Sequence, residues 1–258
     1  MWTRAELKSK GKEAMKRSYW GLVLMGLVIS VISGIASSAS NGMSGSSQLM
    51  TSMMQGGGQV DPDYLMKMMT IMLGGTLAVT IITLLLSIFL YNVLYIGMYR
   101  YHLEARYEQK TVSDMSLLGF GFTNGRYVPI MKTMLLVTVY EFLWSLLFVI
   151  PGIIKSYEYR MIPYILAENP EIDSQTAFKL SKEMMSGQKW NAFVLDLSFI
   201  GWYLLCIPTC GLLAPFYVTP YVSMTNAFLY DTLKQDSSAA GMGSTYDAGS
   251  NEEYTPYQ

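Results

Sequence analysis

The chain has 258 residues, of which 51% are hydrophobic and only 14% are charged, and its formal net charge at pH 7 is −1. Soluble proteins carry about 25% charged residues, so this composition argues against an ordinary soluble protein and favours an integral membrane protein. The nearly neutral chain offers no basic field for nucleic acid, which we do not expect as a partner.

Little in the chain points to catalysis. His102 is the only histidine, which excludes a catalytic triad or metal cluster built on histidines of this chain alone. The cysteines Cys206 and Cys210 lie in an apolar segment without the spacing or partners of a zinc site. The glycines at 56–58 lack the Lys-Ser or Lys-Thr of a phosphate-binding loop. We therefore predict no cofactor, no metal and no enzymatic activity.

The first 18 residues place lysines and arginines around a weak apolar stripe. This pattern predicts an amphipathic helix on the anionic cytoplasmic face of a membrane. Residues 19–39 carry no charge, begin with an aromatic pair and are long enough to span a bilayer, so they form the first predicted transmembrane helix. A cleaved signal peptide is the alternative, because residues 37–39 (Ser-Ser-Ala) resemble a cleavage site.

Residues 40–67 are rich in serine, glycine, methionine and glutamine. This composition predicts a flexible loop on the outer side of the membrane. The methionines of this region suit Cu(I), but no regular Met-x-x-Met run with histidine or cysteine accompanies them. We therefore favour the loop over a copper site.

Residues 68–99 form the second predicted span, and a cluster of basic residues comes after it: Arg100, Arg106, Lys110, Arg126 and Lys132. Because basic residues are retained on the cytoplasmic side, this cluster returns the chain to the cytoplasm. Residues 111–127 begin with helix-capping residues and predict a short interfacial helix that ends near Asn124 and Gly125.

The third and fourth predicted spans are residues 130–150 and 153–167. Each is just long enough to cross a bilayer, and Pro151 and Gly152 between them predict the outside turn. Pro163 is expected to kink the fourth helix, because proline cannot donate the helical hydrogen bond.

Two charge pairs are predicted within this hairpin. Glu141 lies ten residues before Pro151 and Arg160 nine after it, so the two side chains reach a similar depth and are expected to pair. Lys155 and Glu158 are three residues apart and are expected to meet on one face of a helix.

A further amphipathic cytoplasmic helix is predicted over residues 171–188, before the last two spans at 190–206 and 212–230. Asp196 falls inside the first of these spans. Residues 232–258 contain too little apolar surface to pack and are predicted to form a disordered cytoplasmic tail.

The predicted fold is thus all-α, a polytopic membrane domain over residues 1–231 with about six transmembrane helices in three hairpins. A cytoplasmic amphipathic helix precedes each hairpin, and both termini of this multi-pass protein of the cell (plasma) membrane are expected in the cytoplasm. Segment 12–20 aligns with 182–190, and 124–127 loosely repeats the same basic and aromatic corner. The three hairpins therefore read as three repeats in one orientation.

Four stretches carry a family resemblance: MWTRAELKSKGKEAM at the start, GFTNGRYVPIMKTML, IPGIIKSYEYRMIPYILAENP and KLSKEMMSGQKWNAFVLDLSFIGWYLL. They resemble an uncharacterised bacterial membrane family, the domain of unknown function 975. The resemblance covers roughly residues 1–231, except the loop at 40–67, and implies a polytopic membrane protein without a known activity. More remotely, the hairpin pattern resembles the membrane domain of some glycerophosphodiester phosphodiesterases, whose catalytic domain has no counterpart here.

Five ionisable residues lie in predicted spans, where a charge needs a partner or water: Glu141, Lys155, Glu158, Arg160 and Asp196. Two roles are open for these residues. In the first, they line a polar cavity for an ion or lipid headgroup together with Tyr157, Tyr159 and Tyr203. In the second, they pair with one another as a structural clamp. The charges nearly cancel, which favours the clamp.

Three functions remain open. The first is a non-enzymatic scaffold or regulatory accessory protein that contacts anionic lipids at the cytoplasmic face and an unidentified membrane protein partner. The second is a transporter or carrier of a small solute or lipid that uses the charged hairpin. A phospholipid-modifying enzyme is the third and least supported.

Overall fold

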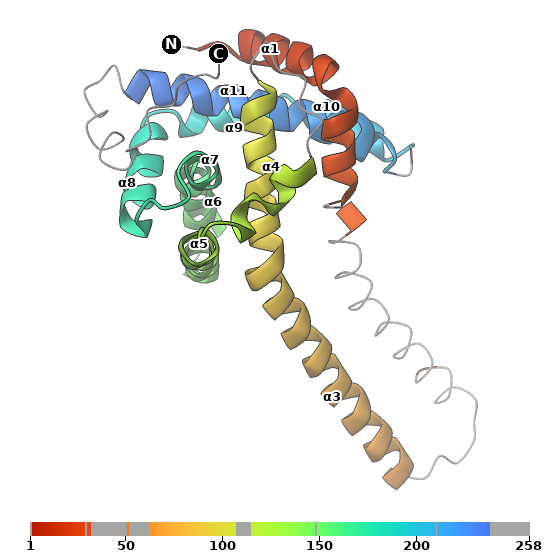
Figure 1. Cartoon of the computed structure of the whole chain (residues 1–258). Helices are drawn as coiled ribbons and strands as arrows, with labels where there is room; N and C mark the ends of the chain where they lie inside the picture. Colours follow the sequence, from red (N-terminus) through yellow and green to blue (C-terminus); the bar gives the residue numbers. More distant parts are fainter. Residues whose placement is uncertain are drawn as a thin grey trace. The chain divides into compact units, whose positions relative to one another are not determined.

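Every regular element in the part of the chain that the structure describes is a helix (Figure 1). The structure is a computed structural model that describes residues 2–28, 30–31, 51, 62–106, 115–147, 149–209 and 211–237. The all-α prediction is confirmed for these residues.

The helices follow one another in this order: α1 (Arg4–Arg17), a short helix (Tyr19–Val28), α3 (Pro62–Leu86), the π-helix η1 (Ser87–Tyr91), α4 (Asn92–Ala105), the 3-10 helix η2 (Met115–Phe122), α5 (Tyr127–Leu147), α6 (Val149–Tyr159), α7 (Ile162–Glu168), α8 (Ser174–Met184), α9 (Lys189–Leu197), α10 (Ile200–Cys206), the π-helix η3 (Ala214–Val218) and α11 (Thr219–Ser237).

The chain divides into two compact units. One unit runs from Val28 to Tyr91 and contains α3 and η1. The other comprises the described residues up to Leu27 and from Asn92 onward, and is called the helical body below. The helical body contains every residue of the candidate site.

Two helices among the described residues are long and apolar enough to cross a membrane: Met66–Ala105, with 40 residues, and Tyr127–Leu147, with 21. The apolar helix Tyr19–Val28 is shorter than the roughly 20 residues that a span needs. Residues 29 and 32–39 of the first predicted span lie outside the described part of the chain. The arrangement with six spans therefore stays a prediction.

The fourth and fifth predicted spans are each divided into two helices. α6 ends at Tyr159 and α7 begins at Ile162, so the kink expected at Pro163 is a complete break. The proline lies in the first turn of α7, where its missing N–H leaves no helical hydrogen bond unmade. α9 ends at Leu197 and α10 begins at Ile200. Each of the four pieces is too short to cross a bilayer by itself.

The hairpin of α5 and α6 turns earlier than predicted. α5 ends at Leu147 and α6 begins at Val149, so Pro151 and Gly152 lie in the first turn of α6 and do not form the connection. Proline is tolerated there, because the N–H groups of a first turn have no partner within the helix. A Cβ at Gly152 would lie 3.1 Å from the Cα of Ser145, so this glycine permits a close approach of α6 to α5.

The apolar stripe of the basic N-terminal helix was expected to face lipid, but it packs against another helix of the protein. Leu7, Gly11, Ala14 and Met15 are buried on α1, which lies along α11 (Figure 1). A Cβ at Gly11 would lie 2.6 Å from Oγ1 of Thr225 and 2.9 Å from its backbone nitrogen. The expected amphipathic helix is present, but its apolar face belongs to the core of the helical body.

The three repeated corners found in the sequence adopt related local structures. α1 ends at a turn at Ser18, η2 ends before the turn at 123–126, and α8 ends before the turn at 185–188; a new helix starts immediately after each. Gly125 and Gly187 have φ angles of 73° and 72°, a conformation that glycine adopts without strain. At each of the three places, the repeated sequence therefore forms a helix, a turn and a second helix.

Two predicted boundaries are wrong. α11 continues to Ser237, so residues 232–237 are helical and do not belong to a disordered tail. The ion pair from Lys234 to Glu168, at 2.7 Å, holds the last turns of this helix. α3 begins at Pro62, inside the predicted outer loop. The remainder of the tail, and the loop up to residue 61 apart from its one described position, lie outside the described residues.

Candidate functional site

The Glu158 carboxylate holds two ammonium groups and joins three helices. Its Oε2 accepts a hydrogen bond from Lys155 Nζ at 2.6 Å, and its Oε1 pairs with Lys189. The carboxylate side chain is only 8% exposed. Ser181 Oγ donates to the backbone carbonyl of Glu158 at 2.6 Å, so α6, α8 and α9 meet at this residue. The predicted pair of Lys155 and Glu158 is confirmed.

Arg160 lies at the break between α6 and α7 and binds Asp196 of α9 through both ends of its guanidinium group. Nη1 donates to Oδ2 at 2.6 Å and Nη2 donates to Oδ1 at 2.7 Å. The Tyr157 hydroxyl donates to the same Oδ2 at 2.8 Å, and Nη2 also donates to Oδ1 of Asn226 at 2.9 Å. This two-point contact between guanidinium and carboxylate ties α9 and α11 to the break.

The predicted pair of Glu141 and Arg160 is wrong. α5 ends at Leu147 and α6 begins at Val149, so Glu141 is six residues before the end of α5 and Arg160 is eleven after the start of α6. The two side chains therefore lie at different distances from the turn of the hairpin, and Arg160 forms its ion pair with Asp196 instead. Glu141 makes no ion pair or side-chain hydrogen bond with another described residue.

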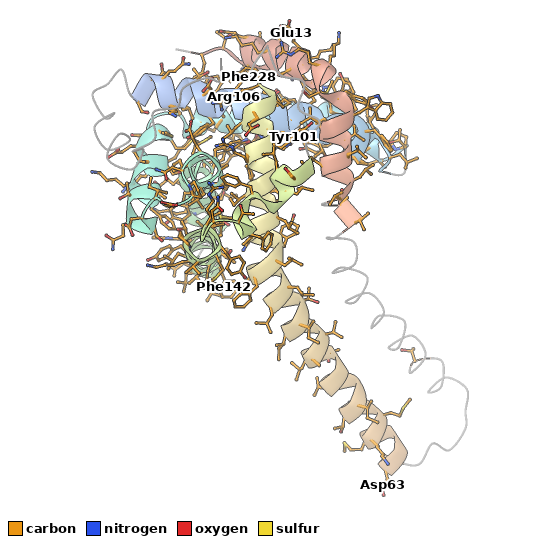
Figure 2. All side chains as sticks on the ribbon, viewed as in Figure 1. Glu13, Asp63, Tyr101, Arg106, Phe142 and Phe228 are labelled. Atoms are coloured by element: carbon orange, nitrogen blue, oxygen red, sulfur yellow. The ribbon has the colours of Figure 1, made fainter. Side chains whose placement is uncertain are left out.

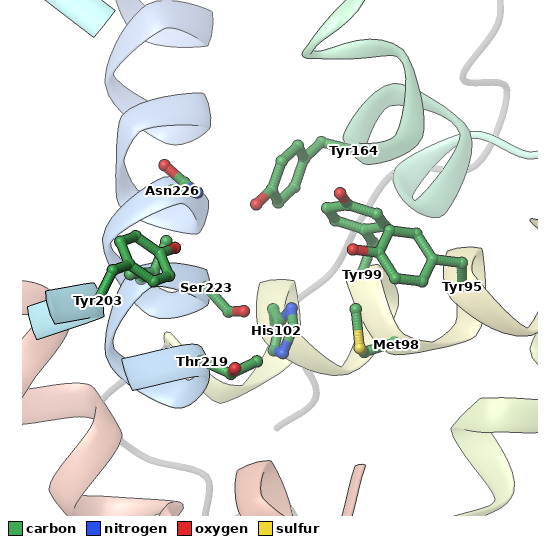
Figure 3. A pocket seen from close by; sticks show the side chains of 10 residues that line it. Tyr95, Met98, Tyr99, His102, Tyr164, Tyr203, Thr219, Ser223 and Asn226 are labelled. Carbon is green, nitrogen blue, oxygen red and sulfur yellow. The ribbon is translucent and has the colours of Figure 1, made fainter. Parts of the chain in front are cut away.

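A pocket of about 200 Å³ lies beside the Arg160 pair, between α4, α7, α10 and α11 (Figure 3). Four tyrosines line it: Tyr95, Tyr99, Tyr164 and Tyr203. The Tyr99 and Tyr164 rings meet edge to face with centroids 4.4 Å apart, which fixes one wall. Asn226 lies across the pocket and connects it to Arg160, while Tyr203 was already a predicted member of a polar cavity.

Several polar groups in this pocket lack a partner within the described protein. His102 is 3% exposed, and no atom of a described residue hydrogen-bonds to its buried Nδ1. Leaving such a nitrogen unpaired costs about 1–3 kcal/mol. The side chains of Tyr164, Thr219 and Ser223 likewise form no hydrogen bond with another described residue. The pocket therefore offers polar groups that are available to a ligand.

The α4 and α11 walls of this pocket were not among the predicted site residues. Tyr95, Tyr99 and His102 recur at the spacing of one helix face, and so do Thr219, Ser223 and Asn226. This periodicity predicts that each set of three side chains shares one face of its helix, and it would have indicated both walls of the pocket.

A second polar cluster joins the end of α7 to α11. Glu168 accepts hydrogen bonds from the Tyr230 hydroxyl at 2.6 Å and from Lys234 Nζ at 2.7 Å. Nearby, Arg106 pairs with Asp231 at 3.1 Å. Burial raises the pKa of the Glu168 carboxyl, but the Lys234 ammonium and the Tyr230 hydroxyl outweigh burial, and the pKa lies below its ordinary value of 4.5.

We expect Glu168→Gln to reduce the sensitivity of the fold to acid. A carboxyl with a lower pKa in the folded than in the unfolded state adds stability above its unfolded pKa, and this contribution is lost as the pH falls through its folded pKa. The wild type should therefore lose more stability than the variant as the pH falls from about 5 to about 3. Thermal unfolding midpoints across this range measure the effect. Glu171→Gln is the control, because Glu171 is exposed and forms no ion pair with a described residue; equal acid curves for wild type and Glu168→Gln would contradict the assignment.

Residues 146–237 match a family described as "Protein of unknown function (DUF975)". The matched segment contains α6 to α11, with Arg160, Asp196 and Asn226, but not Glu141 or the α4 wall of the pocket. No curated protein and no solved structure matches the chain. The similarity therefore supports the predicted resemblance over the second half of the chain and assigns no activity.

Proposed function

We propose that the protein is an integral protein of the cell membrane with a non-catalytic scaffold or regulatory role. The observation that carries this proposal is that four of the five predicted intramembrane charges are engaged in ion pairs. Lys155, Glu158, Arg160 and Asp196 join α6, α9 and α11 through these pairs and the bond from Arg160 to Asn226. A carrier that used these charges would have to break contacts between helices in every cycle.

The surface of the helical body supports a lipid environment. Large apolar side chains on α5, α6 and α9 are exposed over more than 60% of their area, among them Phe142 (Figure 2), Leu146, Ile150 and Trp190. Soluble monomers rarely expose apolar patches of this kind. With the basic N-terminal segment on the cytoplasmic face, the positive-inside rule favours cytoplasmic termini and contact with anionic lipids.

A carrier of a small solute or lipid is the second candidate, and the pocket is the observation that favours it. Its lining includes the side chains of Tyr164, Thr219 and Ser223, which form no hydrogen bond with a described residue, and it reaches the Arg160 pair through Asn226. A scaffold does not require such a pocket, whereas a carrier does.

Native mass spectrometry of the protein, extracted gently from its own membrane, tests the choice. The scaffold proposal expects a second polypeptide at a fixed ratio, which would also identify the process that the protein serves. An unrelated polytopic protein extracted in the same way controls for nonspecific association. A chain that carries no second polypeptide and that transports a solute into vesicles would overturn the proposal in favour of the carrier.

A further inference from the structure

We infer that the pocket between α4, α7, α10 and α11 binds a small neutral polyol, either free glycerol or the glycerol headgroup of a phospholipid. This inference goes beyond the scaffold proposal and does not depend on it, since a ligand at this site would serve a regulated scaffold or a carrier equally. It follows from the size, charge and hydrogen-bonding groups of the pocket.

The size of the pocket limits the ligand. A protein cavity of about 150 Å³ accommodates benzene, with its six heavy atoms. The pocket here measures about 200 Å³, so it fits a ligand slightly larger than benzene. Glycerol has six heavy atoms, and a complete phospholipid headgroup with its phosphate would have to extend out of the pocket. Tyr203 is half exposed and leaves that side open.

The charge of the walls argues against an ion. Arg160 is the nearest cation, and its guanidinium already has both ends on the Asp196 carboxylate. An anion would have to compete with Asp196, and a cation would approach the guanidinium beside Asn226. A charge brought into a partly buried site needs a partner of opposite sign, and here each partner is engaged. A neutral ligand avoids this cost.

The polar groups of the pocket fit a molecule with several hydroxyls. No described residue hydrogen-bonds to the buried Nδ1 of His102, one of the residues that line the pocket, and Ser223 and Tyr164 have hydroxyls that no described residue engages. Oδ1 of Asn226 accepts from Arg160, which leaves its two amide hydrogens to donate. These groups come from three helices and surround the same space (Figure 3), so one hydroxyl cannot satisfy them all. The aromatic walls suit the carbon skeleton of the same ligand.

Saturation-transfer NMR on the full chain in detergent tests binding of the free ligand. Glycerol, choline and acetate are compared at equal concentration as neutral, cationic and anionic probes of similar size. Ser223→Phe fills the pocket and is expected to abolish the glycerol signal. Tyr203→Phe removes one hydroxyl from a half-exposed ring of the pocket lining, is not expected to affect folding, and should weaken glycerol binding by roughly 3- to 10-fold. Tyr19→Phe, outside the pocket, should leave the signal unchanged.

The lipid source is tested separately. The protein is reconstituted with equal amounts of phosphatidylglycerol and phosphatidylethanolamine, and native mass spectrometry records which lipid stays bound. Preferential retention of phosphatidylglycerol that Ser223→Phe abolishes would identify the headgroup as the ligand, whereas a glycerol signal without lipid preference would identify the free polyol. Preference for choline or acetate, or binding of neither glycerol nor phosphatidylglycerol, would overturn the inference.

Discussion

Asp196→Ala is expected to destabilise the folded protein by about 3 kcal/mol, because it leaves the Arg160 guanidinium partly buried without its carboxylate. Arg160 is 17% exposed and donates two hydrogen bonds to Asp196, which also accepts one from Tyr157. The loss should also loosen the break between α6 and α7, since the same pair joins it to α9. Denaturant unfolding of the purified protein in detergent measures the change in free energy.

Two variants separate a clamp from a binding role. The double change Arg160→Met with Asp196→Leu removes both charges and is expected to recover most of the lost stability, since a buried ion pair replaced by apolar groups is often neutral. Lys10→Ala is the matched control, because it breaks an exposed pair with Glu6 and should change stability little. A double variant as unstable as Asp196→Ala would contradict the clamp. A fully stable Asp196→Ala variant would show that the pair contributes nothing to the fold.

Local pairings were predictable, and pairings across the fold were not. Lys155 and Glu158 are three residues apart on one helix, so the helical period alone brings them together. Arg160 and Asp196 are 36 residues apart, and their contact depends on where two helices break. The turn was placed at Pro151 and Gly152 because proline and glycine usually mark turns. The structure instead uses them in a first helical turn, which displaces the register of everything after it.

Hydropathy alone also did not indicate that an apolar segment is divided into two helices. The stretch from Trp190 to Cys206 reads as one uninterrupted span, but it contains a turn near Ser198. Lys8 of α1 donates to the carbonyl oxygen and hydroxyl of Ser198, both at 3.2 Å, so a distant helix satisfies the groups that the break exposes. Such a contact cannot be read from the composition of the segment. The same helix buries its apolar stripe in the core of the helical body, along α11.

Gly97→Ala is expected to have the second large effect, a destabilisation of about 3 kcal/mol or more through overpacking. A Cβ at Gly97 of α4 would lie 2.5 Å from the carbonyl oxygen of Leu117 and 2.6 Å from that of Leu118. The Cα of Leu118 would be only 2.8 Å away. These are backbone atoms of η2, so no side-chain rotation relieves the clash and one helix must move. Because α4 carries Tyr95, Tyr99 and His102, the pocket should be disturbed as well. The free energy of unfolding and the glycerol signal report the two effects.

Gly201→Ala separates this steric cost from the ordinary effect of alanine in a helix. Gly201 also lies in an α-helix, and no heavy atom lies within 4 Å of the position that its Cβ would occupy. Alanine is favoured over glycine in helices by about 1 kcal/mol, so Gly201→Ala should be neutral or slightly stabilising. Gly201 lies in the first turn of α10, where the gain in helix propensity is no larger than at Gly97 in the interior of α4, so the difference between the two variants is a lower bound for the cost of the contact of α4 with η2. Equal stability of the two variants would show that η2 does not pack on α4 at Gly97, and the wall of the pocket would then lack the support that this contact gives it.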